Sequence, residues 1–170
     1  MIRLVTLTAT PLRRLVTAAS SVRPGRVRAR KRILIIDDNC FFTACLRELL
    51  NNEADLVVCA TTQSSRGLSK RVAFYKPDLL VIDVMLGSES GFDLAQKLRT
   101  ERIMTPILFV STLDRPTRRQ LGRIEKSAYA MKNKRPAQLL RALRGILRAH
   151  DTGSDADGQI LELRVAGHPR

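Results

Sequence analysis

Five short apolar runs, each followed by a segment with helical periodicity, constrain the fold of this chain more than any other feature. The runs cover residues 33–36, 56–60, 79–82, 107–110 and 128–131. Apolar runs of this length are typical of strands that are buried on both faces. Because helical segments separate them, we expect a parallel sheet with helices on both sides, which is a doubly wound α/β domain. The expected helices lie near residues 40–50, 64–75, 92–98, 115–125 and 136–148.

The first and last of these helices carry the clearest signals. Asn39 is a favourable N-cap for the first helix, and Pro136 suits the first turn of the last one. Apolar residues at helical spacing predict that the first helix buries Phe41, Phe42, Cys45, Leu46, Leu49 and Leu50. In the last helix we expect the leucines and Ile146 to face inward and Arg141, Arg144 and Arg148 to face outward.

Charge divides the 170 residues into three parts. The net charge is +14, yet the first 32 residues carry nine basic side chains and no acidic one. We interpret residues 1–31 as a basic leader, 32–149 as the folded domain and 150–170 as a flexible tail. Three hypotheses fit the leader: a targeting segment, a basic arm that contacts phosphates or lipid headgroups, and an extension without a fixed structure.

Several classes of protein are excluded by composition. No uncharged apolar run approaches the roughly 18 residues that a membrane-spanning helix needs. The three cysteines form no CxxC pair and the chain has only two histidines, so neither a disulfide framework nor a zinc site is expected. These features favour a cytoplasmic protein.

Polar side chains follow four of the five predicted strands, at the point where each strand ends. They are Asp37, Asp38, Asp83, Ser111, Thr112 and Lys132. Because the carboxyl ends of parallel strands meet along one edge, we expect three carboxylates, a hydroxyl and an ammonium to converge there. A single aspartate after a strand is usually a turn residue, but this joint arrangement is hard to attribute to turn chemistry.

The charges of these groups predict the chemistry of the edge. Three carboxylates close together repel one another unless a cation lies among them, and oxygen ligands with open positions suit Mg²⁺. A lysine and a hydroxyl nearby would contact phosphoryl oxygens. A carboxylate in this setting can act as a nucleophile and form an acyl phosphate. The sequence therefore indicates a Mg²⁺-assisted aspartyl-phosphate site.

Four segments also carry a family resemblance: RILIIDDN (32–39), PDLLVIDVMLGSESGFDL (77–94), PILFVST (106–112) and YAMKNKRP (129–136). Over residues 31–149 the chain resembles the receiver domain of two-component response regulators. Its last segment is most similar to receivers of the LuxR/NarL type, which precede DNA-binding domains. The resemblance implies a flavodoxin-like fold with five parallel strands in the order 2-1-3-4-5.

The resemblance also assigns roles at the predicted edge. Asp83 matches the phospho-accepting aspartate, with Ser111 and Lys132 as the groups that contact the phosphoryl oxygens. Asp38 matches a direct Mg²⁺ ligand and Asp37 its acidic neighbour, so the implied metal set also contains Asp83 and the backbone carbonyl of Met85.

The implied switch consists of Ser111 and the aromatic residue Tyr129. Gly87 stands where the family usually has proline, so we expect a more mobile loop after the phosphorylation site.

We therefore expect a single-domain receiver that signals through a changed protein surface and is not an enzyme in its own right. Its implied partners are a sensor histidine kinase or a histidine phosphotransfer protein. The resemblance also allows a homodimer through the face formed by residues 115–131 and the last helix. Two alternatives remain open: an interaction module that works without phosphorylation, and a remnant of a DNA-associated regulator. Nucleic acid is a less favoured partner, because no aromatic residues alternate with the arginines of the basic helices.

Overall fold

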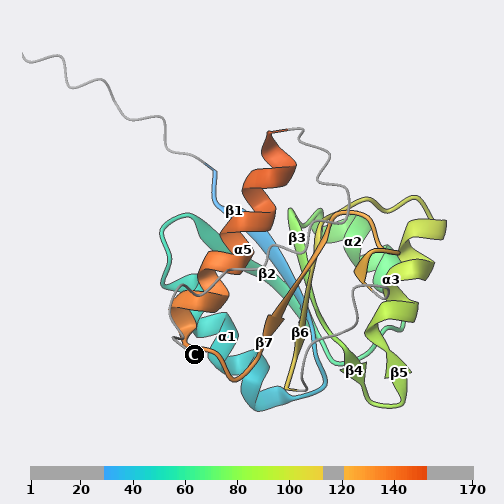
Figure 1. Cartoon of the computed structure of the whole chain (residues 1–170), viewed down its shortest axis with the longest axis horizontal. Helices are drawn as coiled ribbons and strands as arrows, with labels where there is room; N and C mark the ends of the chain where they lie inside the picture. The colour runs from blue at the N-terminus through green and yellow to red at the C-terminus, as the bar shows by residue number, and fades with distance from the viewer. Residues whose placement is uncertain (1–28, 113–120, 153–170) are drawn as a thin grey trace, which may run out of the picture.

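Strands and helices alternate along the chain as the apolar runs predict (Figure 1). The structure is a computed structural model and describes residues 29–112 and 121–152. Its main elements are β1 (Lys31–Ile36), α1 (Cys40–Asn51), β2 (Leu56–Thr62), α2 (Leu68–Tyr75), β3 (Leu79–Asp83), α3 (Gly91–Thr100), β6 (Ile107–Ser111), β7 (Ser127–Met131) and α5 (Pro136–Asp151). Most of the predicted leader, residues 113–120 with much of the helix predicted over 115–125, and the tail beyond residue 152 lie outside the described residues.

The main sheet has five strands in the order β2-β1-β3-β6-β7, and all of its pairings are parallel. Two further strands of two residues each, β4 (Met85–Leu86) and β5 (Glu89–Ser90), form a separate antiparallel hairpin. When these five strands are numbered one to five along the chain, they lie side by side in the sheet in the order 2-1-3-4-5, as predicted. The doubly wound, flavodoxin-like fold is therefore confirmed.

The sheet separates two hydrophobic clusters, because successive side chains of a strand point to opposite faces. Ile33 and Ile35 of β1 pack with α1 and α5, whereas Leu34 and Ile36 pack with α2 and α3. Figure 1 shows the same two layers, with α1 and α5 on one side of the sheet and α2 and α3 on the other. All four of these β1 side chains are fully buried, which explains why the run is apolar throughout.

Helix α1 begins where the sequence predicts, but two residues of its predicted apolar face are exposed. Asn39 is the N-cap, and its side chain accepts a hydrogen bond from the Phe42 N–H. Phe41 is 79% exposed and Cys45 is also exposed, so their predicted burial is wrong. The reason is angular: each lies one residue, or about 100°, away from a residue of the inward-facing set that contains Leu46 and Leu50.

Two other features differ from the predictions: the start of helix α2 and a short hairpin. Helix α2 begins at Leu68 rather than near Ser64, because Gly67 adopts a left-handed conformation with φ of 68° immediately before it. The hairpin of β4 and β5 was not predicted at all. Strands of two residues are too short to show an alternating pattern.

Helix α5 has the predicted inward face, but Arg144 is not simply solvated. Its guanidinium forms ion pairs with Glu53 and Asp55, each with an N–O distance of 2.6 Å, and its side chain is only partly exposed. These pairs join α5 to the loop between α1 and β2. Within residues 29–112 and 121–152, no helix is long and apolar enough to cross a membrane.

Candidate functional site

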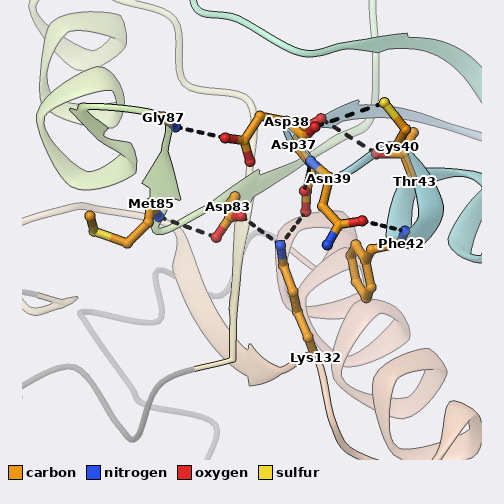
Figure 2. A network of polar contacts seen from close by, with 10 residues as sticks. All are labelled: Asp37, Asp38, Asn39, Cys40, Phe42, Thr43, Asp83, Met85, Gly87 and Lys132. Atoms are coloured by element: carbon orange, nitrogen blue, oxygen red, sulfur yellow. Dashed lines mark hydrogen bonds and ion pairs between the residues drawn. The ribbon is translucent and has the colours of Figure 1, made fainter.

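The fold brings three aspartates together at the carboxyl edge of the sheet. Asp37 and Asp38 follow β1, and Asp83 is the last residue of the neighbouring strand β3. Each contributes a carboxylate oxygen to a group whose oxygens all lie within 4.8 Å of one another. Figure 2 shows them converging from the two strand ends. The predicted clustering of these carboxylates is therefore present in the structure.

Lys132, the first residue after the edge strand β7, reaches this cluster with its long side chain. Its ammonium nitrogen lies 2.5 Å from Asp83 Oδ2 and 2.7 Å from Asp37 Oδ2, and only 7% of its side chain is exposed. In sheet order β7 is two strands away from β3, so the long lysine side chain spans the end of β6. One buried ammonium is thus shared between two carboxylates.

The environment of Asp37 fits a cation. Its side chain is fully buried, and burial raises the pKa of this carboxyl group above the ordinary aspartate value although Lys132 and the Asn39 N–H oppose the rise. Asp37 Oδ2 contacts the Lys132 ammonium as an ion pair but accepts no well-directed hydrogen bond. Three carboxylates therefore face one ammonium, and a divalent cation would offset the remaining negative charge. Oxygen ligands of this kind suit Mg²⁺.

The hairpin after β3 is held against the same carboxylates. The Met85 N–H donates to Asp83 Oδ1 at 3.1 Å, and the Gly87 N–H donates to Asp38 Oδ2 at 2.9 Å. Gly87 has φ of 62°, a left-handed conformation that glycine adopts without strain. The greater mobility expected of this loop stays a prediction, as does the role of the Met85 carbonyl in metal binding.

Gly91, at the start of α3, allows this helix to approach the site closely. A Cβ atom at this position would lie 2.1 Å from the carbonyl oxygen of Asp83, a distance that no side chain tolerates. The Gly91 N–H also donates to the carbonyl of Val84 at 2.8 Å. Glycine is thus required here to bring the helix and the end of β3 together.

The two residues of the predicted switch lie on β6 and β7. Ser111 ends β6, is buried, and accepts a hydrogen bond from the Lys132 N–H through its carbonyl at 2.7 Å. Tyr129 lies in the middle of β7, where it is partly buried and pairs in register with Phe109. Their positions are consistent with the resemblance, but their roles in switching stay predictions.

One neighbour of the site was missed from the sequence. The Phe42 ring lies next to the Lys132 ammonium, with 4.7 Å between the nitrogen and the ring centroid (Figure 2). The apolar periodicity of α1 assigned this residue to the core. No signal in a single sequence distinguishes a ring that covers a lysine from one that packs against leucines.

Comparison with known proteins identifies the family that uses this arrangement. Residues 33–144, which are most of the chain, match the response regulator receiver domain. The chain is 31% identical over 120 residues to the alkaline phosphatase synthesis transcriptional regulatory protein PhoP of Bacillus subtilis, covering 69% of this chain and 49% of that protein. It is 30% identical over 82 residues to a protein-glutamate methylesterase/protein-glutamine glutaminase of Burkholderia lata, covering 48% of this chain and 22% of that protein.

The solved structures agree on the fold. A two-component response regulator of the LuxR family from Aurantimonas aligns with a TM-score of 0.63 and 20% identity, covering 71% of this chain and 87% of that one. The chain spans half or less of the length of the two curated relatives described above. The match to the family extends from β1 into α5 and includes all the residues that meet at the carboxyl edge. This chain therefore belongs to the receiver domain family of two-component response regulators.

Proposed function

We propose that this receiver accepts a phosphoryl group on Asp83 in a Mg²⁺-dependent reaction and passes the signal on through a changed protein surface. The observation that carries the proposal is the shared ammonium of Lys132, which holds Asp83 and Asp37 together in a nearly dry site. A third carboxylate, that of Asp38, lies beside the pair.

The proposed transfer uses few groups of the protein. One carboxylate oxygen of Asp83 bonds to phosphorus while the bond between phosphorus and the donor nitrogen breaks, and that nitrogen keeps the electron pair. Such a reaction depends mainly on positioning and on neutralising charge. The Met85 N–H and the Lys132 ammonium already orient the two oxygens of Asp83. Lys132 and Ser111 would then contact the phosphoryl oxygens.

We assign the metal ligands to Asp37, Asp38, Asp83 and the backbone carbonyl of Met85, with Asp37 acting through water. When bound, Mg²⁺ supplies positive charge that offsets both the carboxylates and the incoming phosphoryl oxygens. The burial of Asp37 and the short separation of the three carboxylates support this assignment.

We propose that the phosphoryl donor is a sensor histidine kinase or a histidine phosphotransfer protein, as the family implies. The signal would pass through Ser111 to Tyr129 on β7, a strand that adjoins β6 along its whole length. A local change of charge at the end of β6 would in this way alter the protein surface at the edge strand β7. The receiver unit is proposed to comprise residues 32–149.

The experiment that tests the proposal is the intact mass of the full chain after incubation with acetyl phosphate, with and without Mg²⁺. We expect one phosphoryl adduct that requires Mg²⁺ and is absent from the Asp83→Asn variant. Asp93→Asn is the matched control, because Asp93 is an exposed aspartate in the first turn of α3. That variant should be phosphorylated like the wild type.

Two outcomes would contradict the proposal. If the wild type forms no adduct, the phosphorylation switch is wrong and an interaction module that works without phosphorylation takes its place. If Asp83→Asn still forms a Mg²⁺-dependent adduct, the acceptor is a different residue.

A further inference from the structure

We propose that Phe42 is a positioning residue for phosphoryl transfer, which shields the Lys132 ammonium and holds it toward Asp83. This inference rests on the proposed function of the site. Its starting point is the ring of Phe42, whose centroid lies 4.7 Å from Lys132 Nζ. A cation at this distance from an aromatic ring is attracted by the electron-rich face of the ring.

The ammonium of Lys132 has different neighbours on its different sides. Asp83 Oδ2 and Asp37 Oδ2 lie at 2.5 and 2.7 Å, and the Phe42 ring contacts it as well. The side chain of Lys132 is nearly excluded from solvent. The ring therefore helps to keep water away from a charge that the carboxylates alone would leave partly open. In a site with little water, the attraction between the ammonium and phosphoryl oxygens is stronger.

The position of Phe42 is itself fixed by the site. The Asn39 N–H donates to Asp37 Oδ1 at 2.9 Å, and the Asn39 side chain accepts from the Phe42 N–H at 2.9 Å. The Phe42 ring contacts the Lys132 ammonium, and this ammonium forms an ion pair with Asp37. Figure 2 shows these four residues together, with dashed lines for the two hydrogen bonds and the ion pair. A movement of Asp37 would therefore shift Asn39 and with it the Phe42 ring. The ring in turn limits the positions that the Lys132 ammonium can occupy.

The preceding residue provides an internal comparison. Phe41 has the same side chain, lies in the same first turn of α1, and is 79% exposed. It is rotated by about 100° from Phe42 around the helix axis. Among the described aromatic residues, Phe42 is the one whose ring contacts a lysine ammonium. A general effect of a fluorinated residue on this turn of α1 should appear at both positions, whereas an effect on Lys132 should appear only at Phe42.

The sharpest test is to replace Phe42 in the full chain by phenylalanines with one, two and three ring fluorines. Fluorination removes negative charge from the ring face with little change in shape. The readout is the initial rate of Mg²⁺-dependent phosphorylation by acetyl phosphate. We expect the rate to fall stepwise with each fluorine, by about fivefold over the series, as the usual strength of such contacts implies. The Phe42→Leu variant should be slower by roughly three- to tenfold, and Phe42→Tyr should stay within about twofold of the wild type.

The same fluorinated series at Phe41 is the matched control and should leave the rate unchanged. A rate that stays constant over the Phe42 series would overturn the proposal, as would an equal fall over the Phe41 series. If the wild type takes up no phosphoryl group at all, the proposed function fails, and the NMR signals of Lys132 then decide this inference. An upfield shift of the methylene protons next to Nζ that disappears in Phe42→Leu supports the contact, and its absence from the wild type contradicts it.

Discussion

The two ends of the sheet use the same kinds of charged side chain in opposite ways. At the carboxyl edge, Asp37 and Asp83 share Lys132 in an almost dry site. At the amino edge, the ion pairs are more open to solvent and lie where strands begin or helices end. They are Lys31 with Asp78 and Asp151, and Arg144 with Glu53 and Asp55.

The difference in burial decides what each arrangement contributes. Exposed ion pairs are screened by water, so those at the amino edge add little to the free energy of unfolding. At the carboxyl edge, burial raises the pKa of the Asp37 carboxyl group, and the nearby Asp83 carboxylate adds to this rise. The carboxyl edge therefore opposes folding slightly and gains affinity for positive charge. Binding of the cation that we propose for this edge would offset that cost to folding.

The largest expected effect is the loss of Lys132. Lys132→Met keeps most of the apolar stem but leaves the buried carboxylates without their ammonium. Removing one partner of a buried ion pair leaves an uncompensated charge, so we expect a loss of about 3 kcal/mol in the free energy of unfolding at pH 7 without Mg²⁺. Urea denaturation in the presence of a chelator measures it. Lys134→Met, at an exposed position in the same loop, should change stability by less than about 0.5 kcal/mol.

If both lysine variants lose stability equally, the contrast between the buried site and an ordinary surface is wrong. If Lys132→Met is as stable as the wild type, the carboxylates must take up protons or water at no cost.

The next effect in size is the response to Mg²⁺. A ligand that binds only the folded state stabilises it by about 2.7 kcal/mol when its concentration is one hundred times Kd. We expect this increase in the wild type, and its loss in Asp38→Asn, which keeps an acceptor for the Gly87 N–H but removes one charge. Thermal unfolding at increasing Mg²⁺ concentration measures the effect. Asp93→Asn should retain the full response, and stabilisation that is equal in all three proteins would place the metal elsewhere.

The carboxyl edge was the more predictable of the two. Asp37, Asp83 and Lys132 each follow an apolar run, and parallel strands necessarily bring such positions to one edge. The order of the strands followed from the family resemblance. In both cases a short local pattern was sufficient, because the geometry of a parallel sheet determines which distant residues lie close together.

What the sequence did not predict depends on contacts between distant segments. The pairing of Arg144 with Glu53 joins residues 91 positions apart, and no periodicity in α5 distinguishes it from a solvated arginine. Phe41 and Phe42 are both apolar, and only the rotation of α1 against the sheet decides which is covered. The hairpin of Met85–Leu86 and Glu89–Ser90 is joined to Asp83 and Asp38 by hydrogen bonds from the Met85 and Gly87 N–H groups. Such contacts require the folded structure.

The smallest expected effect is at the amino edge, where Arg144→Met removes both ion pairs of this residue. Asp55 is about half exposed, so we expect a loss of no more than about 1 kcal/mol at pH 7. The Arg144 hydrogen bond holds the pKa of Asp55 below its ordinary value of 3.8, which means that the stabilisation is complete above that value and disappears as the pH falls through the lowered pKa. Urea denaturation of both proteins between pH 7 and pH 2 should therefore show two stability curves that converge in acid. Curves that stay parallel would mean that Arg144 acts through the packing of its stem, and a loss as large as that of Lys132→Met would remove the contrast between the two edges.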